Sequence, residues 1–477
     1  MLRSISLART AWAECRGWRS VCAATRVWAG SEGRSGEAVG ASTGAGSGAG
    51  KRFVDELEAR GLVVDCSSRD GLAAVVDAAD GGADVGVYAG FDPTASSLHV
   101  GNLVALVMLR RFAAVGVKPV VLLGGATGLL GDPSGKTAER TLMPVDELAR
   151  NMASIEASLR MQLLDGRMEV RNNAEWMAEM GALELLREYG KHFRVSAMLA
   201  RDAVASRLES GTGISFTEFA YQMVQGIDFA HLYESDAVAV QIGGSDQWGN
   251  ITAGLDLIRR RRSGDGTPHE RPDAVGVTYP LLTTADGAKL GKSAGNAVWL
   301  DARLTSPFDL YQYFALAPDA DVRTLLCALT ELSLDTIEDE LAAHFAQPSE
   351  RRAQKTLAAE VTRMVHGTGA AGEAARASDA LYARDGEAAP ASAYPRHELA
   401  PGAPLDGASV VALAAAAGLA PSKSAAKRLA NEGGLYLNGE RVASKDAVVS
   451  ASDISELGGV VIKAGKRKVV LVVEAES

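Results

Sequence analysis

Residues 85 to 103 read Val-Gly-Val-Tyr-Ala-Gly-Phe-Asp-Pro-Thr-Ala-Ser-Ser-Leu-His-Val-Gly-Asn-Leu. The first seven are β-branched, aromatic or small, which predicts a buried strand from Val85 to Phe91. Asp92-Pro93-Thr94 ends that strand, and Ser96 or Ser97 is the expected N-cap of a helix that continues through Met108. A strand that leads into a helix N-terminus presents unpaired amides and a positive dipole end, so this turn suits a phosphate.

Two polar side chains of this stretch are placed to meet such a ligand. Thr94 precedes the helix, and His99 lies in its predicted first turn. Gly101, which precedes Asn102, lets a bulky planar group lie against the backbone. The βα turn of any Rossmann-like domain, with a solvated histidine, accounts for these residues equally well. The stretch alone therefore leaves both interpretations open.

The composition is that of a soluble globular protein with room for two to four domains: 477 residues, 47% hydrophobic and 23% charged. No apolar run approaches the length needed to span a bilayer. The net charge of −10 argues against indiscriminate nucleic-acid binding, so any RNA contact should use local basic patches. Cys66 and Cys327 lie far apart, so neither a disulfide framework nor a Cys-rich zinc site is indicated.

The first 30 residues contain five arginines and one acid, Glu14. Arg-rich, Ser-containing and acid-poor composition is typical of an organelle transit peptide. Residues 30–50 are rich in Gly, Ser and Ala and are expected to be linker, so we assign 1–50 to transit peptide and linker. A frayed N-terminus is the alternative. A transit peptide would place the protein in the mitochondrial matrix or the plastid stroma, between which the sequence does not choose.

A second apolar strand, Val120 to Leu123, is expected to be a buried parallel strand. The glycine-rich segment 124–137 follows, with Asp132 and Lys136 in it and Arg140 just after it. It is not a P-loop, because three residues rather than four separate its last two glycines. Its glycines still allow close approach of a ligand and its cations suit a phosphate, although a solvated loop fits the sequence equally well.

The stretch from Phe216 to Phe229 is predicted to be a helix that carries Tyr221, Gln225 and Asp228 on one stripe, at i, i+4 and i+7. Polar groups on an apolar stripe need partners, because burying one unpaired costs ~1–3 kcal/mol. A substrate or an internal hydrogen-bond network would provide these partners equally well.

Two further segments are suited to nucleotide binding. The strand 237–242 runs into a Gly-Gly turn with Gly244, Asp246 and Gln247, and open α/β sheets bind ligands at such strand ends. Later, Lys289 and Lys292 lie three residues apart on a glycine-containing loop, next to Ser293. Two such lysines can converge on a polyphosphate. By contrast, the arginine run 259–262 is more often a solvated face than an RNA site.

The C-terminal part is predicted to contain a helical region and a small mixed unit. A capping-box start at Ser306 opens helices to about Tyr382, and the Pro- and Ala-rich residues 385–404 are expected to be a linker. A capped helix at 421–434 then precedes a hairpin with an Asn-Gly turn at 435–442. The helix carries its cations on neighbouring positions, which predicts an RNA-binding face against the alternative of a solvated one: Lys423, Lys427 and Arg428.

These motifs resemble, in order and spacing, those of the class I aminoacyl-tRNA synthetases. His99-Val-Gly-Asn102 is similar to the HIGH-type signature, and 289–293 to the KMSKS loop. The run 88–94 resembles tyrosyl-tRNA synthetases of the bacterial type in particular. Asn102 replaces the usual second histidine and keeps a donor without the charge, and Gly291 replaces a serine. The resemblance covers roughly residues 55–477.

The resemblance implies an α/β fold with a Rossmann-like parallel-sheet catalytic domain at 51–300 and an α-helical anticodon-binding domain at 301–384. A linker at 385–404 and a C-terminal α+β RNA-binding domain at 405–477, similar to a module of a ribosomal small-subunit protein, complete it. The implied reaction joins tyrosine to ATP, releases pyrophosphate, and transfers tyrosine from the adenylate to the 3′ end of tRNA(Tyr). ATP is a substrate accompanied by Mg²⁺, the protein supplies no metal site, and the enzyme is expected to be a homodimer without membrane attachment.

The resemblance also assigns roles to residues of this sequence. Those implied in catalysis are Thr94, His99, Lys136, Arg140, Lys289 and Lys292. Those implied in binding tyrosine are Tyr88 and Asp228 at the phenolic hydroxyl, Asp132, Tyr221 and Gln225 at the ammonium, and Gln247 in the pocket wall. Those implied in binding ATP are Asp92, His99, Gly101, Asn102, Gly244, Asp246, Lys289, Lys292 and Ser293. Those implied in binding tRNA are Lys423, Lys427 and Arg428.

Two other interpretations of the sequence compete with this one. A tryptophan-specific synthetase would share the fold, but Tyr88 and Asp228 together suit a phenolic hydroxyl. An RNA-binding protein that has lost catalysis is the other, and the retention of every phosphate-facing candidate argues against it. A second role in RNA splicing, and the source of anticodon selectivity, are left open.

Overall fold

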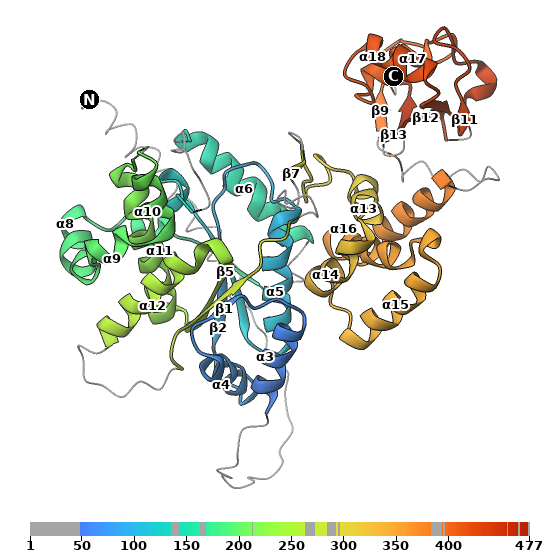
Figure 1. Ribbon diagram of the computed structural model, residues 1–477. Coiled ribbons are helices and arrows are strands. Elements are labelled where there is room, and N and C mark those ends of the chain that lie inside the picture. The colour runs from blue at the N-terminus through green and yellow to red at the C-terminus, as the bar shows by residue number, and fades with distance from the viewer. Residues whose placement is uncertain are drawn as a thin grey trace, which may run out of the picture. The chain divides into compact units, whose positions relative to one another are not determined.

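The structure is a computed structural model that describes residues 48–134, 143–162, 168–211, 213–262, 272–283, 292–293, 296–382, 394, 396–455, 457–465 and 468–475. Its largest sheet has six strands in the order β1-β6-β5-β2-β3-β4 (Figure 1). In chain order they are β1 (Asp65–Cys66), β2 (Gly86–Phe91), β3 (Lys118–Leu123), β4 (Glu169–Asn172), β5 (Val238–Gly244) and β6 (Val275–Tyr279).

The sheet is parallel except at β1, which pairs antiparallel with β6. Strand β2 lies between β3 and β5, with Tyr88 in register with Val120 on one side and Gln241 on the other. The chain proceeds from β2 to β3 in one direction and from β5 to β6 in the other, so the order reverses at β2. The loops after β2, β3 and β5 therefore open at one edge of the sheet, at the position where such sheets bind ligands.

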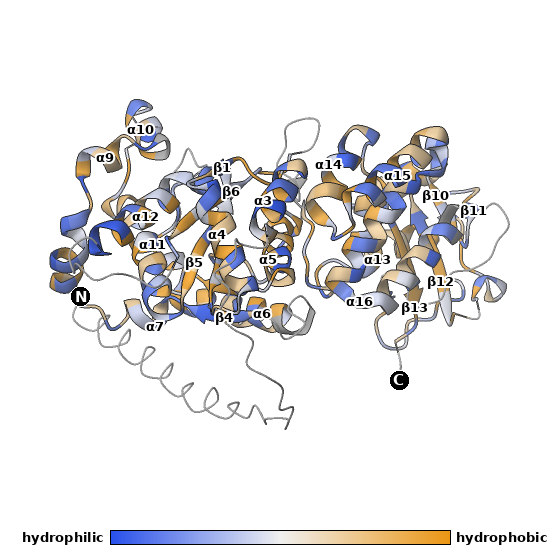
Figure 2. Ribbon diagram, turned by 90° about the horizontal axis from the view of Figure 1, so that it is seen from below, coloured by the Kyte–Doolittle hydropathy of each residue, from blue (hydrophilic) through white to orange (hydrophobic). Residues whose placement is uncertain are grey.

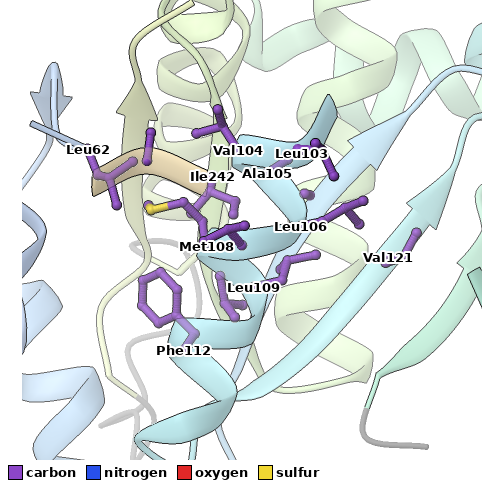
Figure 3. Close-up of a cluster of buried hydrophobic side chains, with 14 of the residues drawn as sticks. Leu62, Leu103, Val104, Ala105, Leu106, Met108, Leu109, Phe112, Val121 and Ile242 are labelled. Atoms are coloured by element: carbon purple, nitrogen blue, oxygen red, sulfur yellow. The ribbon is translucent and has the colours of Figure 1, made fainter. Parts of the chain in front are cut away.

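Helix α5 (Leu103–Ala114) is the core of this arrangement. It is apolar almost all round, and Leu106, Met108 and Phe112 are completely buried against strand residues such as Val121 and Ile242 (Figure 3). Figures 1 and 2 show α5 on one side of the sheet and α11 (Phe216–Ser235) and α12 (Trp248–Arg262) on the other. Each fully buried aliphatic or aromatic side chain contributes ~1.5–3 kcal/mol, so this packing fixes the strand ends firmly.

The predicted N-cap of this helix was wrong. The capping residue is His99, whose side chain accepts a hydrogen bond from the amide of Gly101 and opens a 3₁₀ turn, η2 (Val100–Asn102), that leads into α5. Ser97 is buried instead, and its hydroxyl donates to the carbonyl of Leu98. The Nδ1 atom of His99 thus accepts the N-capping hydrogen bond that a serine hydroxyl was predicted to accept.

The helices at the amino-terminal side and after β3 are α3 (Ala49–Ala59), α4 (Arg69–Asp80), η3 (Thr127–Leu129) and α6 (Val145–Gln162). The segment 174–189 forms several short helical pieces, because Gly181 adopts an extended conformation at its middle. These pieces and their successors are α7 (Ala174–Met177), α8 (Ala182–Glu184), the π-helical η4 (Leu185–Tyr189), η5 (Gly190–His192), α9 (Val195–Leu199) and α10 (Asp202–Glu209).

The residues after β5 include a 3₁₀ turn, a hairpin and a helical region. These are η6 (Ser245–Gln247), β7 (Lys292–Ser293), β8 (Asn296–Ala297), α13 (Pro307–Ala315), α14 (Asp319–Leu329), α15 (Leu334–Ala346), η7 (Pro348–Glu350) and α16 (Arg352–Tyr382). Ser306 caps α13 as predicted, since its hydroxyl accepts from the amide of Asp309. Helix α16 is interrupted at Gly367, whose φ is 84°.

The C-terminal unit has its own sheet, ordered β11-β10-β12-β13-β9. Its elements are β9 (Arg396–Glu398), α17 (Val410–Ala416), α18 (Lys423–Asn431), β10 (Leu435–Leu437), β11 (Glu440–Arg441), η9 (Ala451–Asp453), β12 (Gly459–Ala464) and β13 (Lys468–Val473). Asn438 and Gly439 both have positive φ, which confirms the predicted Asn-Gly hairpin. The predicted fold class, α/β with a parallel-sheet core, further helices and a second small sheet, is confirmed. Among the described helices, none has both the length and the apolar character that a membrane crossing requires.

Candidate active site

Asp228 on α11 lies at the centre of a buried polar network. Its side chain is 1% exposed and accepts hydrogen bonds from Asn173 Nδ2 and Trp176 Nε1, both at 2.9 Å. Burial raises the pKa of Asp228 to about 7, even though its two donors favour the charged form. The charge of Asp228, after burial itself, also raises the pKa of the neighbouring Tyr88 well above its ordinary value.

The network continues from Asn173 to the loop after β2. The Asn173 amide donates a second hydrogen bond to Thr127 Oγ1 at 3.1 Å, and the Thr127 hydroxyl donates to Asp92 Oδ1 at 2.7 Å. The other oxygen of Asp92 accepts from the Tyr221 hydroxyl at 2.9 Å. Burial and the charges of Asp92 and Asp132 raise the pKa of Tyr221 well above its ordinary value, so it remains a donor. Two carboxylates are thus tied together through neutral side chains.

A second network surrounds Asp132, which follows β3 and is 9% exposed. Its Oδ2 accepts from Gln247 Nε2 at 2.7 Å, and its Oδ1 accepts from the amide of Ser134 at 3.0 Å. Asn250 on α12 donates to Gln247 Oε1 at 3.1 Å and so fixes which way that amide points. The carboxylate of Asp132 is therefore oriented from two sides.

Three polar atoms near these networks have no hydrogen-bond partner within the described part of the chain, although all three are buried. They are the Tyr88 hydroxyl, Gln225 Oε1 and Gln241 Oε1. Tyr88 and Gln241 are register partners on adjacent strands, so their side chains lie on the same face of the sheet. Gln225 lies on α11 between Tyr221 and Asp228. Each orphaned group costs ~1–3 kcal/mol, which a polar ligand would recover.

A cavity of about 260 Å³ lies at the turn after β2 and is lined by Thr94, His99, Asn102 and Trp299 among others. His99 Nδ1 accepts from the Gly101 amide at 3.0 Å, and Asn102 Oδ1 accepts from the His99 amide at 3.0 Å. Because Nδ1 is an acceptor, the neutral ring carries its hydrogen on Nε2. This tautomer suits donation to a phosphate oxygen.

Other predicted nucleotide contacts lie at the end of β5 and in the lysine-containing loops. Gly244 ends β5, where an added Cβ would lie 2.7 Å from Leu281 Cδ2 and 2.8 Å from Asp246 Oδ1, so a larger residue would require these side chains to move. Lys292 and Ser293 form β7, but their side chains are not among the described ones. Three predicted cations lie outside the described residues: Lys136, Arg140 and Lys289.

The predicted RNA-binding side chains on α18, which are Lys423, Lys427 and Arg428, are all exposed. Arg428 is 4.0 Å from Glu432. By contrast, three arginines of the 259–262 run each pair with an acid, Asp256, Glu234 or Asp273, at 2.7–2.8 Å. These pairs favour a solvated, charge-compensated face for that run.

Sequence reasoning missed several members of the two networks. No role was predicted for Thr127, Asn173, Trp176, Gln241 or Asn250, although Asn173 directly follows β4 at the ligand-binding edge of the sheet. The position of a polar side chain at the end of a strand was the available signal. It was not used because β4, with Glu169 and Arg171 in it, does not have the apolar character of a buried strand.

Comparisons with known proteins agree with this geometry. The family described as tRNA synthetases class I (W and Y) matches residues 81–383, and the tyrosine–tRNA ligase SYY-like C-terminal domain matches 395–472. A tyrosine–tRNA ligase of Listeria welshimeri is 42% identical over 427 residues, which cover 88% of this chain and 99% of the relative. One of Opitutus terrae is 44% identical over 429 residues, or 87% of this chain and 98% of the relative.

Solved structures give the same result. A C-terminally truncated mitochondrial tyrosyl-tRNA synthetase of Aspergillus nidulans superposes with a TM-score of 0.62 at 34% identity, over 69% of this chain and 94% of that one. The corresponding Coccidioides posadasii protein gives 0.59 at 33% identity, over 78% and 99%. The chain therefore belongs to the tyrosyl-tRNA synthetases of the bacterial type, a family of class I tyrosine–tRNA ligases.

Proposed function

We propose that the two networks and the adjoining cavity are the site at which this tyrosine–tRNA ligase forms tyrosyl-adenylate. The three orphaned polar atoms carry the proposal, because a bound tyrosine would supply their partners. Its phenolic hydroxyl would meet Tyr88 and Asp228, and its ammonium would meet Asp132, Tyr221 and Gln225. Gln247 and Gln241 would complete the polar lining.

In the first step the tyrosine carboxylate attacks the α-phosphorus of ATP, a new O–P bond forms, and the bond to pyrophosphate breaks. No side chain has to act as a nucleophile, since cations and donors aimed at the developing charge accelerate such a transfer. Thr94 and His99 would act from the cavity, and Lys136, Arg140, Lys289 and Lys292 would act from the two loops. Mg²⁺ would enter bound to the phosphate oxygens of ATP, which are the hard ligands it prefers.

The adenosine part of ATP would lie where the chain leaves β2 and β5. Asp92, Gly101 and Asn102 belong to the first turn, and Gly244, Asp246 and Ser293 to the other segments. Gly244 has no side chain, so a ribose can approach its backbone closely. In the second step, the terminal adenosine of tRNA(Tyr) takes the tyrosyl group through a ribose hydroxyl.

The test is amino-acid-dependent exchange of pyrophosphate into ATP, using the chain without residues 1–47. We expect exchange with tyrosine and none with phenylalanine or tryptophan. Exchange with tryptophan instead would overturn the assignment of Tyr88 and Asp228 to a phenolic hydroxyl. No exchange with any amino acid, from folded protein that still binds tRNA, would favour the non-catalytic RNA-binding interpretation.

We also propose that the enzyme works as a homodimer, joined through the segment from α8 to the start of α11. This segment exposes several large apolar side chains, among them Leu183 at 83% and Phe216 at 74%. A second copy of the same face is the natural cover for a self-complementary apolar patch. Phe216→Asp should shift the mass in light scattering from dimer to monomer. Val64→Asp, at an exposed valine outside the segment, is the control and should leave the dimer intact.

The Arg-rich N-terminus and the mitochondrial solved relatives support an organellar location, in the mitochondrial matrix or the plastid stroma. Residues 1–50 fused to a fluorescent protein should be imported and cleaved by isolated organelles. Import by neither mitochondria nor plastids would overturn the transit peptide.

A further inference from the structure

The ring of His231 stacks on the indole that donates to Asp228. The ring centroids of His231 and Trp176 are 4.3 Å apart and the planes differ by 19°. His231 lies three residues after Asp228 on α11, so one helical turn presents both the carboxylate and the stacking ring to Trp176. The indole is thus held at its N–H edge by one α11 residue and on its face by another.

The indole of Trp176 is half-buried at the edge of the main core, and its N–H and one of its faces are contacted from α11. Trp176 lies on α7, a helix of four residues that buries none of them. A helix this short has no stability of its own, so the direction of its side chains depends on tertiary contacts. Within this packing, the hydrogen bond to Asp228 and the stack on His231 are the two contacts from α11 that direct the indole N–H at the carboxylate.

The direction of the indole N–H matters because the carboxylate of Asp228 has to accept hydrogen bonds from Trp176, from Asn173 and from the substrate. Asn173 occupies one lone pair on Oδ2 and Trp176 one on Oδ1, and the substrate hydroxyl needs an unobstructed one. A tilted indole would either lose its bond to the carboxylate or turn the carboxylate with it. Both outcomes would move the acceptor away from the tyrosine hydroxyl.

We propose that His231 is a positioning residue for recognition of the tyrosine hydroxyl, acting through Trp176 on the carboxylate of Asp228. The proposal rests on the function proposed above. His231 touches neither substrate nor reacting atoms in this scheme, so its removal changes tyrosine binding and selectivity rather than phosphoryl transfer.

Burial favours the neutral form of the stacked His231 ring. Burial lowers the pKa of its imidazole, and Arg171 from β4 acts in the same direction. Glu234 on α11 and Asp236 at its C-terminal end raise the pKa of the imidazole, but Asp236 is itself paired with Arg171 at 2.9 Å. Acid therefore protonates the stacked ring, which places a cation against the indole face and gives a spectroscopic signature of the contact.

The test is a double-mutant cycle on tyrosine affinity, measured at equilibrium with the chain lacking residues 1–47. An aromatic pair of this kind is worth roughly a three- to tenfold change in affinity, so His231→Ala should raise the dissociation constant for tyrosine by about that factor. His231→Phe, which keeps a stacking ring, should restore most of it. In a Trp176→Phe background, which has no indole N–H, His231→Ala should change tyrosine affinity less than about twofold.

Selectivity and the ATP site provide further readouts. His231→Ala should reduce the ratio of tyrosine to phenylalanine affinity and leave the KM for ATP unchanged. His397→Ala, at a histidine on β9 of the C-terminal sheet, is the matched control. In the chain lacking residues 1–47, acid should change the fluorescence of Trp176, which is measured as the difference between this chain and its Trp176→Phe variant. This pH-dependent change should disappear in His231→Phe. Equal loss in both Trp176 backgrounds, or an equal rise of the KM for ATP, would overturn the proposal. Absence of tyrosine-dependent exchange in the unsubstituted chain would instead overturn the proposed function.

Discussion

The hydroxyl end and the phosphate end of the proposed site are built in different ways. Around Asp228 on α11, Asn173 directly after β4 and Trp176 on α7 each donate a hydrogen bond at 2.9 Å before any substrate arrives. Around His99, a cavity of about 260 Å³ is lined by side chains that are held through backbone amides. A closed polar network discriminates between substrates, because a wrong ligand leaves buried groups unpaired. A turn that presents donors to a cavity can follow charge as it develops.

The largest effect is expected where the closed network is opened. Asp228→Asn keeps the volume but replaces a charged acceptor and sets a second amide against Asn173. We expect kcat/KM for tyrosine in pyrophosphate exchange to fall by roughly 70-fold or more, since a hydrogen bond to a buried charged group is worth about 1.5–3 kcal/mol and the amide hydrogen left unpaired costs ~1–3 kcal/mol in addition. Asp256→Asn, on the exposed surface of α12, is the control and should be neutral. Near-normal use of tyrosine by Asp228→Asn would remove the basis of the specificity argument.

At the phosphate end, His99→Ala should slow adenylate formation while tyrosine affinity stays within about twofold. Loss of one donor to developing charge costs ~2–4 kcal/mol in the barrier, or about 30- to 1000-fold in rate. His99→Asn separates the two uses of the ring, because its amide oxygen can replace Nδ1 as the cap for Gly101 but does not reach as far as Nε2. Stopped-flow adenylate formation measures both variants, and we expect His99→Asn to be stable yet slow. A parallel loss of tyrosine affinity would show that the two ends are not separable.

The pH dependence of tyrosine binding should come from the hydroxyl end. Without substrate the pKa of Asp228 is about 7, and a phenolic hydroxyl that donates to the carboxylate favours its ionised form. Affinity for tyrosine should therefore rise about tenfold from pH 6 to pH 8, and binding at pH 6 should release about one proton. Folding stability should depend on pH in the opposite direction. Because the pKa of Asp228 is higher in the folded than in the unfolded chain, its contribution to the free energy of unfolding without tyrosine falls as the pH rises from about 4 to 7 and does not change above pH 7. Calorimetry in two buffers of different ionisation enthalpy tests the proton release, which Asp228→Asn should abolish.

The smallest effects are expected far from both ends, on α18. Lys423→Ala and Lys427→Ala should each weaken tRNA binding by a few-fold and reduce the salt dependence of log Kd by ~0.7–0.9, as for the loss of one phosphate contact. Pyrophosphate exchange, which needs no tRNA, should not change. Lys445→Ala, an exposed lysine of the same unit outside the helix, is the control. If the tRNA affinity of the double variant Lys423→Ala/Lys427→Ala is unaltered, the basic face of α18 is a solvated surface and not an RNA-binding site.

Sequence reasoning reached the parts of the site that a local pattern encodes. The apolar runs of β2, β3 and β5 predict a buried parallel sheet, and the spacing of Tyr221, Gln225 and Asp228 predicts one helical face. It failed where partners come from distant segments. Asn173 and Trp176 acquire meaning only when β4 and α7 meet α11, and no periodicity in 168–177 indicates that. His99 as a helix cap was missed for a similar reason, since a histidine nitrogen rarely takes the place of a serine oxygen there.

The side-chain amide of Asn173, which donates one Nδ2 hydrogen to each of two acceptors, limits how this pocket can be redesigned. Its Nδ2 donates to both Asp228 and Thr127, and its Oδ1 accepts from the amide of Ala126 at 2.7 Å, so every one of its bonds is set by a neighbour. A variant intended to charge tRNA with a tyrosine analogue without a hydroxyl would begin by replacing Asp228 with an apolar residue. That change strands an amide hydrogen that cannot turn elsewhere without breaking its other bonds. Libraries for such an enzyme should therefore vary positions 173 and 228 together, because an apolar residue at 228 alone leaves the Asn173 amide hydrogen unpaired and lowers the stability of the fold.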